Sequence, residues 1–387
     1  MPQKANYILW LASWYPNSYD RYNGDFIQRH AEALSTYLTV NVIHIQLVPP
    51  DTHLPVREVN QKEQLTEYIY YLKAVEQGNI WQKITLQIRY MHCIYLAVNE
   101  LLQQCGLPRW VHVHVPVKIG VAALWLKWRY KLPYALTEHW GIYNKYALDA
   151  FEKRNVWFKW MVRTTLKHAT VFAPVSRYLG NAMLQQVLHA NKPFTPILNV
   201  VDTNIFHYKA FVSKQDEFWF LHASTMNHPK NPEGLLRAFE RAYQEVPQLR
   251  LRLLGFAPES VIVLAHQLGL ADVVVFEGMQ PQAVLAARMQ ISEAFILFSN
   301  YENMPCVVLE SLCCGLPVIS TDVGGVAEVI NTTNGIIISP QDEAALTKAI
   351  LEVANNQYRF NRLAIATEAQ AHFSYAAIGE QLAALYQ

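Results

Sequence analysis

The amino-acid sequence predicts an α/β protein built from two Rossmann-like domains. Its 387 residues exceed what one hydrophobic core usually holds, so two domains are expected. A hydrophobic content of 52% with only 16% charged residues indicates a well-packed globular chain and argues against disorder. Short apolar runs alternate with segments of helical periodicity in both halves, as in parallel sheets covered by helices.

In the first half, the apolar run at residues 7–13 predicts a strand, which a loop at 14–24 and a helix at about 25–37 follow. A polar, proline-containing stretch at 49–65 predicts an exposed excursion, and a helix is expected at 81–105, before Gly106 and Pro108. Ser176 is expected to cap another helix. The remaining strands of this half are predicted at 40–47, 67–72, 110–115, 133–137 and 170–175.

The second half repeats the alternation of strands and helices. Its strands are predicted at residues 218–223, 249–254, 273–278, 294–298 and 317–321. Helices are expected at about 233–245, after Pro305, at 341–355, at 357–371 and at 374–386.

The stretch from Ser299 to Glu328 forms a strand, turn, helix and strand unit with two acids. Glu302 lies on the turn, and Glu310 lies about two turns into the helix, which Gly315 is expected to end in a left-handed conformation. Carboxyl ends of parallel strands and helix N-termini are where ligands and phosphates bind. By itself, this pair of acids equally describes a surface helix with two solvated side chains.

The whole stretch is more specific, and it resembles the signature of family 4 of the retaining glycosyltransferases. Those enzymes have two facing Rossmann-like domains, the glycosyltransferase-B fold. The signature combines a turn with Glu, a hydrophobic helix with a second Glu, and a Gly-Gly loop. The matching residues here are Glu302, Asn303, Pro305, Glu310, Gly315, Pro317, Val318, Gly324, Gly325 and Glu328.

The resemblance implies a role for several residues. Glu302 would position the donor sugar, and His139, at the end of a strand, would contact the sugar or phosphate. Lys230 would neutralise the diphosphate, and Glu310 would hold the ribose hydroxyls. The other donor-binding residues implied are Asn303, Met304, Pro305, Val308, Ser224 and Gly278, and a cleft loop is implied at Gly24 and Asp25. For His139 and for the loop, an ordinary structural role stays open.

The chain also departs from the family pattern. The arginine that usually shares the diphosphate with the lysine falls near Ser224 or Thr225, and neither residue is basic. Asn303 replaces the commoner glycine, a change that still permits tight turn geometry. The connector between domains matches at Asn199, Asp202 and Phe206.

These matches predict three parts of the chain. Residues 1–202 would form an acceptor-binding domain, and residues 203–370 would form a nucleotide-sugar-binding domain. Residues 207–217, just past the boundary, are polar and resemble a short linker. The resemblance implies that a terminal helix within 371–387 crosses back to the first domain.

Composition restricts the partners and the compartment. A net charge of +1 gives no electrostatic case for nucleic acid. The absence of a signal peptide and an odd count of 5 cysteines predict reduced thiols in the cytoplasm. We expect no cofactor and no metal, since there is no Asp-x-Asp pair and His112 and His114 have no evident third ligand.

The segment at residues 143–169 is basic and rich in aromatic residues, among them Lys145, Tyr146, Trp157 and Trp160. Such a segment suits a peripheral contact with the inner face of the plasma membrane. A helix packed on the sheet with a solvated basic face explains it equally well.

The sequence therefore predicts a retaining, metal-independent glycosyltransferase that moves a sugar from a UDP- or GDP-linked donor to a sugar or lipid-linked acceptor. Cell-surface polysaccharide or glycolipid synthesis is the expected setting. Two alternatives remain open: a sugar-nucleotide epimerase on the same fold, and a non-catalytic nucleotide-sugar-binding subunit that has lost its arginine.

Overall fold

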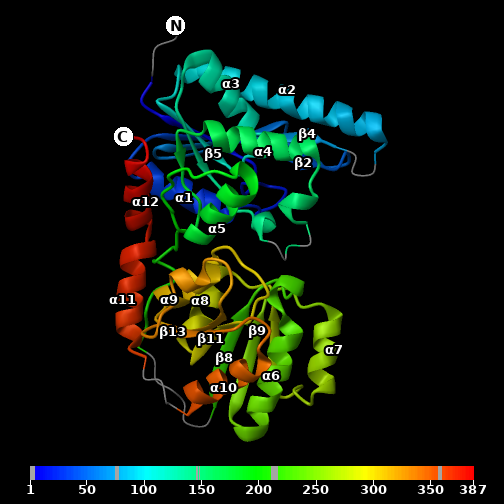
Figure 1. Ribbon diagram of the computed structural model, residues 1–387, viewed down its shortest axis with the longest axis vertical. Helices are drawn as coiled ribbons and strands as arrows, with labels where there is room; N and C mark the ends of the chain where they lie inside the picture. Colours follow the sequence, from blue (N-terminus) through cyan, green and yellow to red (C-terminus); the bar gives the residue numbers. More distant parts are fainter. Residues whose placement is uncertain (1–4, 75–77, 145–146, 148, 211–216, 356–359) are drawn as a thin grey trace. The chain divides into compact units, whose positions relative to one another are not determined.

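The computed structural model describes residues 5–74, 78–144, 147, 149–210, 217–355 and 360–387 (Figure 1). The chain divides into two compact units. Unit 1 comprises Met1–Tyr143, Asp149–Val200 and Tyr375–Gln387, and unit 2 comprises Asn144–Leu148 and Val201–Ser374. Lys145, Tyr146, part of the predicted linker (211–216) and the start of the predicted helix at 357–371 lie outside the described residues.

Unit 1 contains a seven-stranded sheet of order β3-β4-β2-β1-β5-β6-β7. All neighbouring strands run parallel except β3 and β4. The strands are β1 (Ile8–Ala12), β2 (Val40–Val48), β3 (Arg57–Lys62), β4 (Leu65–Lys73), β5 (Trp110–His114), β6 (Tyr134–Thr137) and β7 (Val171–Phe172).

The helices of unit 1 lie in two layers. The connections from β4 to β7 step one way across the sheet, whereas the β1–β2 connection steps the other way, so right-handed crossovers put their helices on opposite faces. One layer holds α2 (Ile80–Cys105), α3 (Gly120–Tyr130) and α4 (Val156–His168), and the other holds α1 (Asp25–Ser35) and α12 (Tyr375–Ala384). Helix α5 (Arg177–Met183) follows β7, and the Ser176 hydroxyl caps it by accepting the Leu179 N–H.

The core of unit 1 draws on both ends of the chain. Ile378, Leu382 and Tyr386 pack into one cluster with Trp10 and Ile27. Helix α12 approaches α1 closely at Gly379, where an added Cβ would lie 2.4 Å from the Ala33 carbonyl oxygen. The last residues of the chain are therefore an integral part of this unit.

Unit 2 contains a six-stranded, fully parallel sheet of order β10-β9-β8-β11-β12-β13. The chain runs outward from β8 in one direction and from β11 in the other, so the order reverses between these two central strands. Its strands are β8 (Phe218–Ala223), β9 (Leu249–Leu254), β10 (Val274–Gly278), β11 (Ala294–Leu297), β12 (Val318–Thr321) and β13 (Gly335–Ile338).

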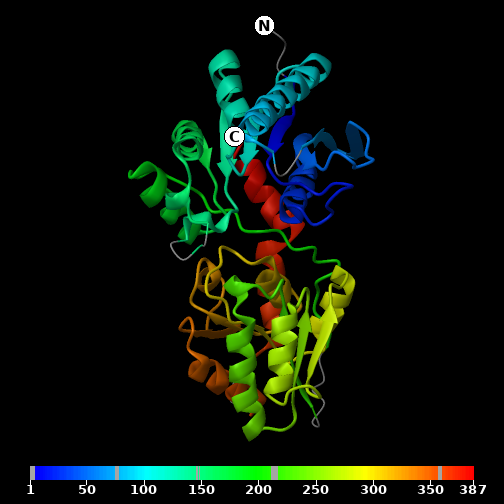
Figure 2. The same ribbon diagram turned by 90° about the vertical axis from the view of Figure 1, so that its right-hand side faces the viewer.

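Helices cover this sheet too, and Figure 2 shows α6 and α7 side by side. Gly315 has φ +72° just after α9, and the Leu316 N–H bonds the Ser311 carbonyl, so the predicted left-handed helix end is confirmed. The helices are α6 (Pro232–Glu245), α7 (Glu259–Gln267), α8 (Gln282–Gln290), α9 (Cys306–Cys313), α10 (Glu343–Ala354) and α11 (Arg362–Phe373).

The structure differs from the prediction in two places. The stretch at 49–65 is largely exposed, as expected, but it contains an unpredicted strand, β3, which pairs antiparallel with β4 at the sheet edge. The strand predicted at 170–175 is shorter, because β7 spans only Val171–Phe172, although the Ala173 N–H still donates to the Leu136 carbonyl at 2.8 Å. The structure adds α3, α7, α8 and β13, which were not predicted.

Candidate functional site

A buried ion pair joins two loops at the carboxyl edge of the unit 2 sheet. Lys230 follows β8 and Glu302 follows β11, the two strands between which the strand order reverses. The Lys230 Nζ lies 2.5 Å from Glu302 Oε1, and the two side chains are only 21% and 9% exposed. In open α/β sheets, ligands bind beside such a reversal, so this pair marks the candidate site of unit 2.

Several contacts fix Glu302 on its turn. Its Oε1 also accepts a hydrogen bond from the Ser299 hydroxyl at 2.7 Å, and the Ser299 carbonyl in turn accepts one from Thr321. Gly324, at φ +61°, lies so close that an added Cβ would be 2.1 Å from the Glu302 carbonyl oxygen. The Gly325 N–H donates to the Asn303 carbonyl at 2.6 Å. The Gly-Gly loop therefore serves as packing surface for the turn that holds the carboxylate.

Helix α9 begins directly after this turn. Pro305 is its N-cap, one position before the first helical turn in which it was expected. The first N–H groups of a helix lack intrahelical carbonyl partners, and its dipole is positive at this end. Glu310 on the same helix is 5% exposed, and Met304 and Val308 are buried to a similar extent, at 4% and 0%. Because the Met304 and Val308 side chains are apolar and buried, these two residues can offer a ligand only their backbone groups.

Ser224 is engaged within the fold. The His222 Nδ1 must donate to the Ile296 carbonyl at 2.9 Å, so its Nε2 accepts the Ser224 hydroxyl at 2.6 Å. The Ser224 oxygen also accepts the Met226 N–H. Burial lowers the pKa of His222 to about 4, which keeps this imidazole neutral. His222 was not identified from the sequence, because a single histidine in an apolar strand carries no distinct signal.

The neighbouring loop ends are partly open. Thr225 is exposed, and neither Thr225 nor Ser224, near which the family pattern has its arginine, carries a charge. Gly278 ends β10 with φ +67° and has no heavy atom within 4 Å of a built Cβ. Its carbonyl accepts the Gly255 N–H at 2.8 Å. The turn at Gly278, which the resemblance implies is a donor-binding residue, therefore has open space beside it.

In unit 1, His139 belongs to a cluster of buried aromatic and imidazole rings. Its Nε2 lies 3.3 Å from His114 Nδ1, and the ring centroids of Phe26 and His30 lie 4.8 and 5.7 Å away. Burial, together with neighbouring imidazoles, lowers the pKa of His139 well below its usual value. Its imidazole is neutral near pH 7 and suits hydrogen bonding rather than proton donation.

Glu138 braces the loop that carries His139. One carboxylate oxygen accepts the backbone N–H groups of His139 (2.9 Å) and Trp140 (3.0 Å), and the other accepts the Tyr143 hydroxyl at 2.9 Å. Complete burial raises the pKa of Glu138 to about 7, although these donors favour the ionised form. Glu138 therefore shapes the strand end beside His139.

A second chain of hydrogen bonds lies behind this loop. The Tyr386 hydroxyl lies 2.5 Å from His112 Nδ1, and the other nitrogen of His112 lies 2.8 Å from the Thr137 hydroxyl. Burial lowers the pKa of His112 to about 3. The sequence reveals His112 but not its partner, which is 274 residues away.

The loop after β1 ends at Gly24, which has φ +70° and begins α1. An added Cβ would lie 2.8 Å from the Trp14 backbone, so only glycine fits here. The next residue, Asp25, forms an ion pair with Arg29 at 2.6 Å. Gly24 and Asp25 both have structural roles in the start of α1.

The predicted site residues therefore fall into two groups. Lys230, Glu302 and the start of α9 come together in unit 2, whereas His139 and the Gly24 loop belong to unit 1. Among the residues that the structure describes, no three His, Cys, Asp or Glu side chains gather as a metal site. Within the same described parts of the chain, no helix is both long and apolar enough to span a membrane.

The segment at 143–169 forms α4 in its second half. Val156, Trp157 and Trp160 of this helix are exposed, at 80%, 75% and 49%. Arg154, just before α4, stacks over Trp140 and Phe158. The aromatic side chains that start the helix thus face solvent.

Two family models match consecutive parts of the chain. The model "Glycosyltransferase Family 4" matches residues 27–205, and the model "Glycosyl transferases group 1" matches residues 205–377. Together they extend across both structural units.

Curated relatives are similar to the chain over different lengths. An N-acetyl-alpha-D-glucosaminyl L-malate synthase from Bacillus anthracis is 27% identical over 44% of this chain and 46% of its own. A D-inositol 3-phosphate glycosyltransferase from Thermobispora bispora is 31% identical over 41% and 40%. The chain thus spans less than half the length of these two relatives. A Bacillus subtilis protein, TuaC, whose name assigns it to teichuronic acid biosynthesis as a glycosyltransferase, is 25% identical over 90% of both chains.

Solved structures share the fold over nearly the whole chain. Sucrose-phosphate synthase from Thermosynechococcus elongatus superposes with a TM-score of 0.77 at 19% identity, covering 98% of both chains. Anabaena Alr3699/HepE, solved with UDP and glucose, has a TM-score of 0.70 at 15% identity and covers 98% of this chain and 99% of its own.

Proposed function

The chain belongs to the group 1, family 4 glycosyltransferases and has their glycosyltransferase-B fold, and from this we propose that it transfers a sugar from a nucleotide-diphosphate sugar to an acceptor. A UDP- or GDP-linked donor fits the site, and UDP is the first choice because HepE was solved with UDP and glucose. The relatives named for teichuronic acid biosynthesis and inositol phosphate glycosylation support a hydroxyl acceptor.

The observation that carries the proposal is the Lys230–Glu302 pair where the strand order reverses in unit 2. A nucleotide diphosphate needs a cation and backbone N–H groups on one side, and the donor sugar needs an acceptor of hydrogen bonds on the other. Lys230 and the first N–H groups of α9 supply the former, and Glu302 supplies the latter. The ion pair thus places a cation for the diphosphate beside a carboxylate for the donor sugar.

The proposed reaction retains the configuration of the transferred sugar and needs no metal ion in the site. As the bond from the sugar to the diphosphate breaks, Lys230 and the α9 N-terminus stabilise the negative charge of the leaving diphosphate. Glu302 stabilises the positive charge that develops on the sugar. The acceptor hydroxyl attacks from the same face and transfers its proton to the leaving phosphate. His139, a neutral imidazole, hydrogen-bonds a sugar hydroxyl, and Glu310 holds the ribose.

The proposed setting is the cytoplasm, at the inner face of the plasma membrane, in the synthesis of a cell-surface polysaccharide or glycolipid. A sugar or a lipid-linked sugar is the proposed acceptor. The similarity to TuaC over 90% of the chain supports a polysaccharide.

Thermal unfolding with UDP, GDP, ADP and CMP tests the donor. A ligand that binds only the folded protein raises the unfolding midpoint, so one nucleoside diphosphate should stabilise the chain. Lys230→Ala and Glu310→Ala should abolish that shift, whereas Glu343→Ala on α10, which removes an ion pair with Arg237 of α6, should retain it. No shift with any nucleotide would contradict the proposal.

Exposed Thr225 in place of the family's arginine favours a second candidate, a subunit that binds nucleotide sugar without transferring it. Binding of a nucleotide sugar with neither transfer to any acceptor nor release of free nucleotide would identify that candidate. An epimerase would instead convert the sugar nucleotide without any acceptor. NMR of the sugar anomeric protons distinguishes all three results and reports whether configuration is retained.

A further inference from the structure

The first ten residues of α2 project from unit 1 with no side chain buried. The buried residues of this helix begin only at Tyr90. At 1.5 Å per residue, residues 80–89 extend for about 15 Å. Figure 1 shows α2 as the long helix at the top of the unit, extending past strand β4. We call residues 80–89 the α2 overhang.

The α2 overhang is apolar where a solvated helix would be polar. Trp81, Ile80 and Ile88 are 73%, 66% and 64% exposed, and Ile84 is also exposed. Among the described residues, the exposed tryptophans lie on three neighbouring helices only: Trp81 on α2, Trp128 on α3, and Trp157 and Trp160 on α4. Ile80, Trp81, Ile84 and Ile88 recur at helical spacing within the α2 overhang, and an exposed apolar patch of this kind marks an interaction surface.

The same helices are strongly basic. Helices α2, α3 and α4 contain one acidic residue, Glu100, which pairs with Arg57. Their seven cationic side chains are Lys83, Arg89, Lys127, Arg129, Lys159, Arg163 and Lys167. Because the whole chain has a net charge of only +1, this helix layer is a local excess of positive charge.

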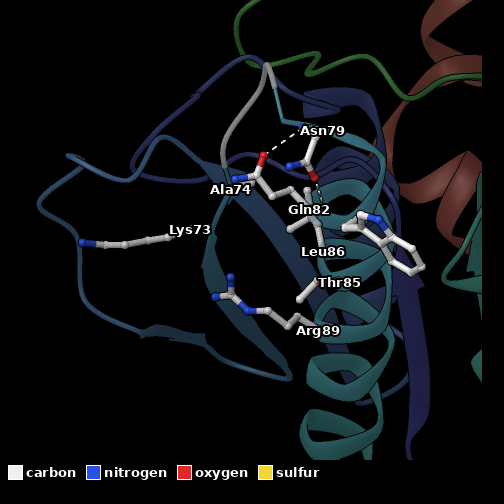
Figure 3. Close-up of a pocket in the computed structure, with 8 residues that line it drawn as sticks. Lys73, Ala74, Asn79, Gln82, Thr85, Leu86 and Arg89 are labelled. Carbon is white, nitrogen blue, oxygen red and sulfur yellow. Dashed lines mark hydrogen bonds between the residues drawn. The ribbon is translucent and has the colours of Figure 1, made fainter.

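A pocket beneath the α2 overhang adds one further cation, Lys73, to Arg89. It has a volume of about 290 Å³ and lies between the end of β4 and the first turns of α2, with both residues in its lining. The Lys73 side chain extends away from α2 at this strand end (Figure 3). Within the described parts of the chain, neither cation pairs with an acidic side chain. At the N-terminus of α2, Asn79 and Gln82 form a capping box that satisfies the N–H groups of these two residues. The side chains of Lys73 and Arg89 give the pocket its positive charge, and its volume is large enough to admit a phosphate group.

From these features, we propose that the α2 overhang docks on a bilayer that contains anionic lipid, with Trp81, Ile84 and Ile88 inserted among the lipid chains and with Lys73 and Arg89 bound to lipid phosphates. Aromatic and branched apolar groups interleaved with cations are the composition of helices that lie at such an interface. A second copy of the chain fits less well, since a symmetric contact would bring the same cations together.

This docking would orient the acceptor edge of unit 1 toward the lipid. All strands from β4 to β7 run parallel, so the N-termini of α2 and α4 lie at the carboxyl edge of the sheet, the edge that carries His139. Trp157 and Trp160, in the first turns of α4, would form a second contact at the same edge. A lipid-linked acceptor in the bilayer would then reach the site from the membrane side. The docking itself does not depend on the proposed transfer reaction.

Vesicle co-sedimentation of the full chain tests the inference. Binding is expected to equimolar phosphatidylcholine–phosphatidylglycerol vesicles, to weaken as salt is added, and to be absent with phosphatidylcholine alone. Trp81→Gln/Ile88→Gln should lower the partition coefficient roughly tenfold or more. Lys73→Gln and Arg89→Gln should each lower it about fivefold, as expected for one charge near an anionic surface.

Trp128→Gln is the control, because it removes an exposed tryptophan outside the overhang (56% exposed, against 73% for Trp81) and should bind vesicles as the parent does. Nucleotide binding should be unchanged in every variant, which shows that each remains folded and separates this test from that of the proposed function. Equal vesicle binding by parent and Trp81→Gln/Ile88→Gln would overturn the inference. So would a dimer, seen by sedimentation velocity, that only this variant dissociates, since the overhang would then bind a second copy.

Discussion

Replacing Glu302 with glutamine should strengthen the binding of UDP while abolishing transfer. In the structure, the Lys230 ammonium lies 2.5 Å from the Glu302 carboxylate, so an incoming diphosphate must compete with that carboxylate for the cation. Glutamine keeps an oxygen that can accept the Ser299 and Lys230 hydrogen bonds but removes the negative charge. The lysine is then more available to the diphosphate.

The size of the effect follows from the two kinds of hydrogen bond. A charge-assisted bond contributes about 1.5–3 kcal/mol, whereas a bond to a neutral acceptor contributes about 0.5–1.5 kcal/mol. The carboxylate is 9% exposed and the lysine 21%, so solvent weakens the pair only in part. If the bond from Lys230 to residue 302 is weaker by about 1–2 kcal/mol in the glutamine variant, the diphosphate binds more tightly by that amount. This difference corresponds to a roughly 5- to 30-fold lower Kd for UDP.

Isothermal titration calorimetry with UDP measures this change directly, and the sugar-free nucleotide avoids the contacts that Glu302 is proposed to make with the sugar. Glu343→Gln is the control, because it removes a carboxylate, 20% exposed, that pairs with Arg237 and Arg241 away from the site. Its UDP affinity should equal that of the parent. If folded Glu302→Gln binds UDP no more tightly than the parent, the reasoning that Lys230 serves the diphosphate is refuted.

Three further predictions concern the missing cation, the Gly-Gly loop and the buried histidines. Thr225→Arg should supply one charge-assisted bond to the diphosphate, about 1.5–3 kcal/mol, and so lower the Kd for UDP roughly 10- to 150-fold in calorimetry. Gly324→Ala should lower the free energy of unfolding in urea by about 1–3 kcal/mol, because its Cβ would collide with a backbone carbonyl at a positive φ. Between pH 7 and pH 5, each of His112 and His222 should cost about 2 kcal/mol of stability, because unfolding lets each gain a proton below its usual pKa of about 6.5. Glu138, whose pKa is raised to about 7, gains stability on the same acidification, because the folded protein then binds the proton more readily than the unfolded chain. This gain offsets the loss of stability from about one of the two histidines.

For each of these three predictions, one outcome would contradict the reasoning. An unchanged Kd for UDP in Thr225→Arg would show that the diphosphate lies elsewhere. A Gly324→Ala protein with the parent's urea midpoint would mean that the loop can move away from the turn. For the histidines, the stability lost on acidification should be smaller by about 2 kcal/mol in His222→Gln than in the parent. An equal loss in the two proteins would contradict the neutral state assigned to that imidazole.

The sequence alone predicted the helices and strands correctly wherever the local residue pattern agrees with the tertiary structure. The apolar runs at β11 and β12, with Gly315 between them, gave the strand–helix–strand unit within a few residues of its observed bounds. Strand β3 was missed because its six residues, REVNQK, include a single apolar residue, Val59, and show no alternation. Only its pairing with β4 at the sheet edge makes it a strand.

The site was predicted as a set of residues but not as a geometry. Lys230 and Glu302 are 72 positions apart, and their contact depends on β8 lying beside β11. No local pattern specifies which strands become neighbours. Ser224 shows the converse: a polar residue at a promising strand end, whose hydroxyl is committed to His222 by a contact that periodicity cannot reveal.

The packing of α12 determines the order in which the two units can be completed during synthesis. Tyr386 is 1% exposed in the core of unit 1, and Ile378 and Leu382 lie in the same cluster. A ribosome makes the whole of the segment 201–374 before it makes these three residues. Unit 2 can therefore fold first. Until α12 is made, unit 1 leaves the apolar face of α1 that α12 will cover exposed to solvent. Until residues 375–387 emerge, the first part of the nascent chain is the part that needs protection from aggregation.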